Sequence, residues 1–106
     1  MSWGDIALHD VEGRTVVALR GEVDLDAVLR FRAEGPRADV VDVVASDELT
    51  FLDSSGLKFL LELTSRNPEL VLVDPAPALT ELLEMTNTAQ LFRTRTGPVR
   101  SGGADG

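Results

Sequence analysis

The chain has 106 residues, of which 43% are hydrophobic and 26% are charged, a balance typical of one soluble globular domain. Its net charge of −8 argues against nucleic acid as a partner, because proteins bind nucleic acid largely through Lys and Arg contacts to phosphates. Cysteine is absent, which excludes disulfides and thiolate chemistry, and the only histidine is His9. A zinc site or a Ser-His-Asp hydrolase would depend on that one imidazole, so we expect no metal site and no enzyme activity.

No segment is long and apolar enough to span a membrane, and the N-terminus lacks a basic region followed by an apolar run. We therefore expect a cytoplasmic protein without membrane insertion.

The first quarter of the chain predicts a β-hairpin. Ile6 and Leu8 alternate with polar neighbours, Glu12-Gly13 supplies a turn, and residues 15–19 are rich in β-branched side chains. The segment Gly21-Glu22-Val23-Asp24 is then expected to interrupt the second strand.

A short helix is expected next, with Asp24 as its N-cap. Four residues carry its helical spacing: Leu25, Val28, Leu29 and Arg32. Gly35-Pro36 is expected to stop this helix, because Gly favours a helix end and Pro prevents continuation. Residues 40–44 are a nearly continuous β-branched run, as in a strand covered by helices, and residues 46–48 read as an acidic linker.

The second half repeats the alternation of helix and strand. Four residues share one face of an expected helix that ends at Asn67-Pro68: Leu57, Leu60, Leu61 and Thr64. Residues 70–73 predict a short buried strand, and Pro75-Ala76-Pro77 predicts the start of a third helix. Asn87 suits a left-handed helix end, and residues 91–94 predict a last short strand.

Strands that alternate with helices imply parallel pairing through right-handed crossovers, while the hairpin adds an antiparallel strand. The expected fold class is α/β: a mixed sheet of four to five strands covered by about three helices, the first of them short. Residues 1–96 are expected to form one domain and residues 97–106 a disordered tail with almost nothing to bury.

The segment FLDSSGLKFL, residues 51–60, allows two interpretations. Asp53 or a serine caps the following helix, because Asp and Ser oxygens accept hydrogen bonds from free amides of the first turn. Alternatively, a serine carries a phosphate, since a helix N-terminus presents amide donors and a local positive field. Periodicity alone does not separate these interpretations.

Three segments in the same order resemble the STAS family of sulphate transporter and anti-sigma factor antagonist domains. Residues 49–57 are similar to the family's phenylalanine-apolar-aspartate-serine-serine-glycine-leucine signature. Residues 21–24 resemble its glycine-glutamate-apolar-aspartate turn, and residues 70–86 resemble its last strand and helix. The likeness covers roughly residues 3–94.

This resemblance implies a bacterial anti-sigma factor antagonist. Such a protein binds an anti-sigma factor that is also a serine kinase, and thereby frees a sigma factor until phosphorylation of the serine after the aspartate stops the binding. By position that serine is Ser54, and a serine phosphatase resets it. The resemblance also implies that Asp24, Asp53 and Ser55 lie at the partner surface and that Gly56 lets the partner approach the backbone. The kinase supplies the nucleotide, so no cofactor is expected here.

The chain departs from the family in its first crossover, which is shorter by roughly two turns. If residues 57, 60, 61 and 64 face the sheet, Phe59 and Leu63 point elsewhere on the helix. They either pack against a neighbouring helix or form an apolar patch beside Ser54 that contacts the partner, and replacing Phe59 distinguishes the two by its effect on stability.

Two other functions are open to the sequence. The domain serves as a non-phosphorylated subunit of a larger assembly, such as a lipid transporter, or it is a serine hydrolase that uses Ser54. The hydrolase lacks a credible base, because His9 is the only histidine.

Overall fold

Five strands form one mixed sheet in the order β1-β2-β3-β4-β5 in a computed structural model that describes residues 4–34 and 40–96. The strands are β1 Gly4–Val11, β2 Arg14–Val23, β3 Val43–Leu52, β4 Val71–Val73 and β5 Arg93–Arg95. The helices are α1 Leu25–Glu34, α2 Ser54–Arg66 and α3 Pro77–Met85, with a 3₁₀ turn, η1, at Ala89–Leu91. β1 and β2 pair antiparallel and all other neighbours pair parallel, so the expected α/β class is confirmed.

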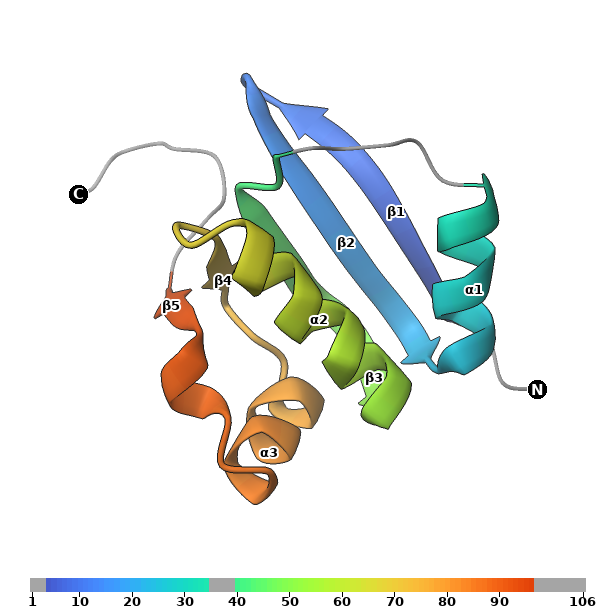
Figure 1. Ribbon diagram of the computed structural model, residues 1–106, viewed down its shortest axis with the longest axis vertical. Helices are drawn as coiled ribbons and strands as arrows, with labels where there is room; N and C mark the ends of the chain where they lie inside the picture. Colours follow the sequence, from blue (N-terminus) through green and yellow to red (C-terminus); the bar gives the residue numbers. More distant parts are fainter. Residues whose placement is uncertain (1–3, 35–39, 97–106) are drawn as a thin grey trace.

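The helices lie on one face of the sheet (Figure 1). Each crossover, from β2 to β3, β3 to β4 and β4 to β5, moves one strand in the same direction. Right-handed crossovers that always step the same way must place their helices on the same side. The main core therefore fills the space between this face and the helices, while Val16, Val43 and Val73 form a smaller buried cluster on the opposite face.

The hairpin is tighter and longer than the sequence suggested. Glu12 and Gly13 both have positive φ, 52° and 81°, which is the backbone that a two-residue hairpin turn needs. The expected break at residues 21–24 is wrong, because β2 continues to Val23. Gly21 has φ 66° and lies at a register shift in the pairing with β3, so its left-handed backbone produces an irregularity inside the strand instead of ending it.

The acidic linker predicted at residues 46–48 is also wrong, since β3 runs through it from Val43 to Leu52. Ser46 is buried and its Oγ accepts a hydrogen bond of 3.1 Å from the amide of Ala76. Asp47 and Glu48 are exposed, so the strand keeps its charges in solvent. Charge composition suggested a loop, but pairing with β2 and burial of Leu49 determine a strand.

The remaining expected elements are present with small shifts. Asp24 caps α1 by accepting a hydrogen bond from the Ala27 amide at 3.0 Å, and Asn67 is the C-cap of α2. α3 begins at Pro77, and Asn87 has the left-handed φ of 59°. The tail predicted at residues 97–106 and the Gly35-Pro36 helix stop lie outside the described residues.

Candidate functional site

Ser54 is the first residue of α2, directly after β3, and it is exposed. Asp53 is the N-cap, with extended backbone (φ −98°, ψ −173°), and its Oδ1 accepts a hydrogen bond of 3.0 Å from the Gly56 amide. The cap is therefore Asp53, and the Ser54 hydroxyl makes no hydrogen bond with the described residues. An exposed serine without a structural task, at a helix N-terminus, is free to take a covalent group.

Two helix N-termini lie side by side at this edge of the sheet. Val23 and Leu52 are paired in register, and the Asp53 amide donates to the Val23 carbonyl at 3.3 Å. Each strand is followed by one capping aspartate, Asp24 for α1 and Asp53 for α2. The structure thus brings together two of the predicted site residues that are far apart in the sequence.

A family model described as "Mlab, STAS domain" matches residues 6–93, which is most of the chain. The chain belongs to the STAS domain family. A search of curated proteins found no match. The matched region includes both capping aspartates and the whole serine-containing turn, so these residues occupy the family's domain and not an extension of it.

Gly56 has a different position in this STAS domain from the one that the resemblance implied. It is buried, and a Cβ atom built there would lie 2.3 Å from Leu52 Cδ1 and 3.2 Å from the Val23 carbonyl oxygen. The close approach that needs glycine is therefore internal, between the first turn of α2 and the ends of β2 and β3. Gly56 is thus required for packing inside the domain, and it sets the position of Ser54.

Phe59 also has a structural position that corrects one of its two expectations. It is only 4% exposed and belongs to the main core, so it does not form an exposed apolar patch. Its ring meets Phe31 of α1 edge to face, with centroids 5.5 Å apart and an interplanar angle of 78°. Packing against a neighbouring helix, the other expectation, is what the structure shows; Leu63 is half-buried against the same core.

The buried face of α2 therefore differs from the sequence pattern. The expected face held residues 57, 60, 61 and 64, whereas the buried residues are Gly56, Leu57, Phe59 and Leu60. Because α1 packs beside α2, this helix buries residues against two neighbours, the sheet and α1, and a one-sided pattern understates its apolar surface.

Exposed apolar residues near Ser54 were missed by the sequence reasoning. Leu25 and Leu29 lie one turn apart on α1 and are 53% and 54% exposed, while Ala27 and Val28 carry its buried side. Phe51, next to the end of β3, is 49% exposed. The helical spacing of Leu25, Val28 and Leu29 did not say which of them is buried, and the structure shows that Val28 is buried while Leu25 and Leu29 are exposed.

His9 lies far from Ser54. It pairs with Val16 near the hairpin turn, whereas Ser54 follows the opposite end of β2, beyond Val23. Val16, the partner of His9, and Val23, next to the serine-containing turn, are seven residues apart along β2, which corresponds to about 23 Å. The imidazole is therefore out of reach as a base for Ser54.

Within residues 4–34 and 40–96, no group of three or more His, Cys, Asp or Glu side chains could hold a metal ion. None of the helices in that part of the chain is long and apolar enough to cross a bilayer.

Proposed function

We propose that this STAS domain is an anti-sigma factor antagonist whose binding to an anti-sigma factor, itself a serine kinase, is switched off by phosphorylation of Ser54. The observation that carries the proposal is that Ser54 is exposed at the first position of α2 while Asp53 alone supplies the cap. The hydroxyl can therefore be modified without loss of a structural hydrogen bond.

The switch is electrostatic. Phosphorylation adds about −1.5 to −2 charges, and a helix N-terminus favours negative charge. Lys58 lies one turn after Ser54 on α2, is exposed, and makes no hydrogen bond or ion pair with the described residues. An i,i+4 pair of phosphate and lysine is favourable on a helix surface, so the fold accommodates the dianion.

The partner surface combines that charge change with apolar contact. Leu25, directly after the Asp24 cap at the start of α1, is an exposed apolar side chain at this edge, and Asp24, Asp53 and Ser55 complete its polar part. A partner that buries this surface around an uncharged Ser54 would have to desolvate the phosphate after modification. The chain is thus a substrate and a binding partner of the kinase, and a serine phosphatase restores it; no cofactor of its own is needed.

The proposal is tested by incubating the protein with ATP and each anti-sigma serine kinase from the same genome, and locating the phosphate by mass spectrometry. One phosphate is expected at Ser54 in the wild type and in Ser55→Ala, and none in Ser54→Ala. Phosphate only at other residues, or none with any of these kinases, would contradict the proposal.

Binding provides the second arm of the test. Isothermal titration calorimetry should show that the phosphorylated protein binds the kinase at least about tenfold more weakly, a difference of about 1.4 kcal/mol. The unphosphorylated Leu25→Ser variant should also bind more weakly without loss of folding, because Leu25 is exposed. Equal affinity of the two phosphorylation states would rule out the switch even if Ser54 is modified.

A second candidate function is favoured by the description of the matching family model, which names Mlab and no sigma-factor role. Here the domain is a non-phosphorylated binding subunit of a larger assembly such as a lipid transporter. Affinity purification of the tagged protein from its own cells distinguishes the two: co-purifying transporter components support this candidate, and a kinase or anti-sigma factor supports the first. Neighbouring genes give the same discrimination.

A further inference from the structure

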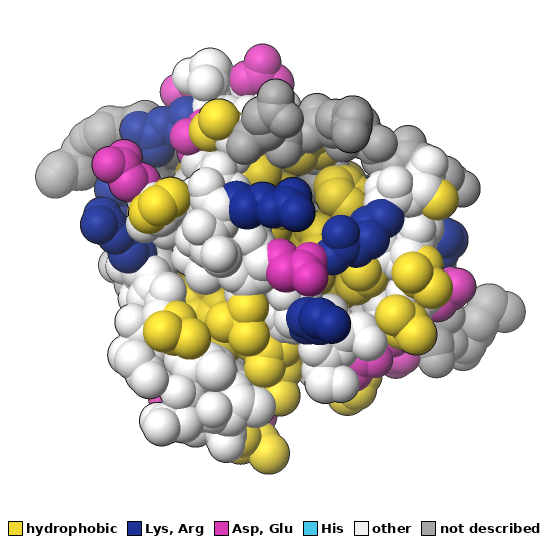
Figure 2. All heavy atoms as spheres, viewed as in Figure 1, with side chains coloured by type: hydrophobic (Ala, Val, Ile, Leu, Met, Phe, Trp, Pro, Cys, Tyr) yellow, Lys and Arg dark blue, Asp and Glu magenta, His cyan; other side chains and the backbone are white. Residues whose placement is uncertain are grey.

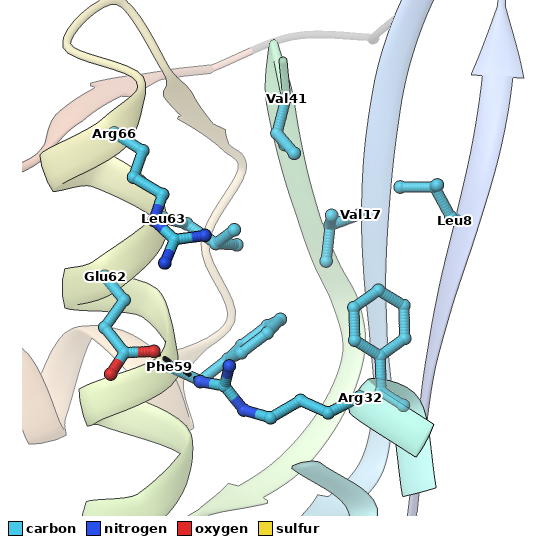
Figure 3. Close-up of a pocket in the computed structure, with 9 residues that line it drawn as sticks. Leu8, Val17, Arg32, Val41, Phe59, Glu62, Leu63 and Arg66 are labelled. Carbon is cyan, nitrogen blue, oxygen red and sulfur yellow. Dashed lines mark hydrogen bonds and ion pairs between the residues drawn. The ribbon is translucent and has the colours of Figure 1, made fainter. Parts of the chain in front are cut away.

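A hollow of about 110 Å³ opens on the helical face of the sheet, between α1 and α2, away from Ser54. Its floor is apolar and is formed by Leu8 of β1, Val17 of β2, Val41 just before β3, and Phe59 and Leu63 of α2 (Figure 3). Phe31 of α1 completes the wall. The lining residues of α2 begin at Phe59, five residues or about 7.5 Å along the helix axis from Ser54, and no residue of the serine-containing turn lines the hollow.

The hollow exists because α1 is short. Ten helical residues of α1 span about 15 Å, while the eight residues of β1, the strand that α1 mainly contacts, span about 26 Å. The helix is therefore clearly shorter than the strand on which it packs, and among the described residues α2 does not close the remaining space. The apolar residues that line the hollow differ in access: Val17 and Phe59 are core residues, 1% and 4% exposed, while Leu8, Phe31 and Leu63 are only partly buried and supply the accessible apolar surface.

The mouth of the hollow is positively charged, although the whole chain carries −8. Figure 2 shows Lys and Arg side chains around one acidic side chain, in front of hydrophobic atoms, between α1 and α2. The acid is Glu62, which is bonded to Arg32, and Arg66 lies on the other side of it (Figure 3). The pKa of Glu62 is lowered, first by the hydrogen bond from Arg32 and then by the charges of Arg32, Lys58 and Arg66.

One carboxylate therefore faces three cations. Arg32 is committed to Glu62 and also lies 5.7 Å from the Phe59 ring centroid. Arg66 makes no hydrogen bond or ion pair with the described residues, and its guanidinium lines the hollow. Arg66 is thus the side chain with donors available to an anion that enters the mouth.

We propose that this hollow binds a small carboxylate with a compact apolar body of about four to six carbon atoms, its carboxylate paired with Arg66 and its apolar group on Phe31 and Leu63. The size follows from the volume, because a cavity of about 150 Å³ holds benzene and this one is somewhat smaller and open on one side. The ligand is expected to be an anion because cations outnumber acids at the mouth. It is expected to have an apolar body because the side chains below the mouth are apolar.

The test uses 3-methylbutanoate and its uncharged analogue 3-methylbutanamide as probes, titrated into the ¹⁵N-labelled full chain. Saturable shifts are expected for amides around the hollow, in Val17, Phe31 and Leu63, and not for Ser54. The acid should bind about fivefold more tightly than the amide at low salt, and this preference should shrink in about 0.5 M salt, as for any exposed charge pair.

Two variants in the hollow and one control variant on β5 assign the contacts. Arg66→Gln should weaken binding of the acid about fivefold and leave the amide unchanged, since it removes one exposed charge partner. Arg93→Gln, the same change on exposed β5 away from the hollow, should change neither. Leu63→Phe should fill the hollow and abolish binding of both probes, with melting curves to verify folding.

The proposal is overturned if the acid gives no saturable shifts, if the amide binds as well as the acid, or if Arg66→Gln matches Arg93→Gln. None of these outcomes depends on Ser54 or on a kinase, so failure here leaves the proposed switch standing, and failure of the switch leaves this site standing.

Discussion

At the scale of single residues, adjacent positions in the serine-containing turn have different structural roles. Asp53 caps the helix, Gly56 lets the helix approach the strand ends, and Ser54 is left exposed without a structural hydrogen bond. Stability and modification are therefore separable by substitution at adjacent positions.

Asp53→Ala should lower the free energy of unfolding by about 1 kcal/mol, because the Gly56 amide loses its side-chain acceptor. Urea denaturation at pH 7 measures this loss. Ser54→Ala is the matched control and should change stability by less than about 0.5 kcal/mol, as expected for an exposed site. A larger loss in Ser54→Ala than in Asp53→Ala would show that the serine is the true cap.

Gly56→Ala should destabilise the domain by about 1–3 kcal/mol, although alanine is the better helix former. The added Cβ would lie 2.3 Å from Leu52 Cδ1, and Leu52 is only 5% exposed, so the clash has little room to relax. Denaturant unfolding tests the change, with Ser55→Ala in the same turn as control. An unchanged midpoint for Gly56→Ala would contradict this packing.

At the scale of elements, the contact between α1 and α2 determines which residues α2 buries. Phe59 meets Phe31 of α1 and Arg32 lies over the same ring, so the two helices share one aromatic contact beside the sheet. A short α1 keeps that contact and leaves the adjacent surface open.

Phe59→Ala should cost about 3–5 kcal/mol of stability and lower the melting temperature strongly, because a core ring is lost. Leu29→Ala is the control on the facing helix, since Leu29 is 54% exposed and should change stability by about 0.5 kcal/mol or less. Differential scanning calorimetry measures both melting temperatures. A near-normal melting temperature for Phe59→Ala would show that Phe59 is not part of the core.

The Arg32–Glu62 pair should give a small stability increment that depends on pH. The hydrogen bond from Arg32 lowers the pKa of Glu62, so the folded state holds the charged form more strongly than the unfolded chain does. The increment is therefore present above the ordinary glutamate pKa of 4.5 and is lost as the pH falls through the lowered pKa of the folded state. The two side chains are 47% and 41% exposed, which limits the increment to below about 1 kcal/mol.

Denaturation of Glu62→Gln across that pH range measures the increment. The variant should be less stable than the wild type at pH 7, and this difference should shrink as the pH is lowered below 4.5. A stability difference that does not change with pH would show that Glu62 acts by packing and not by charge.

At the scale of the whole molecule, the order of strands and the hand of the crossovers produce a sheet with helices on one face only. The chain carries a large excess of acidic residues, with a net charge of −8. Locally the sign is reversed around Glu62, where Arg32, Lys58 and Arg66 lie close to one carboxylate. Net charge of this size destabilises the folded state through repulsion, which salt screens.

The melting temperature at pH 7 should therefore rise by a few degrees between about 0.01 and 0.3 M sodium chloride. Near the isoelectric point, about 4.4, the same salt change should have little effect, because the net repulsion is gone. Differential scanning calorimetry at both pH values checks this. A salt-independent melting temperature at pH 7 would show that the acids are too dispersed to interact.

Much of the fold could be predicted from local chemistry. The Glu12-Gly13 turn, the Asp24 cap, and Asn67 and Asn87 at helix ends depend on the backbone and hydrogen bonds of a few adjacent residues, and these were placed correctly. The cap of α2 was narrowed to Asp53 or a serine, and the structure shows that it is Asp53.

The sequence by itself determined the alternation of elements and the position of Ser54 in a capped turn, because both depend on near neighbours in the chain. Only the tertiary structure decided that β3 extends through Asp47 and Glu48, that Phe59 is buried while Leu25 is exposed, and that a charged hollow opens beside α1. These depend on which element packs against which, and that is set by contacts between residues distant in the sequence.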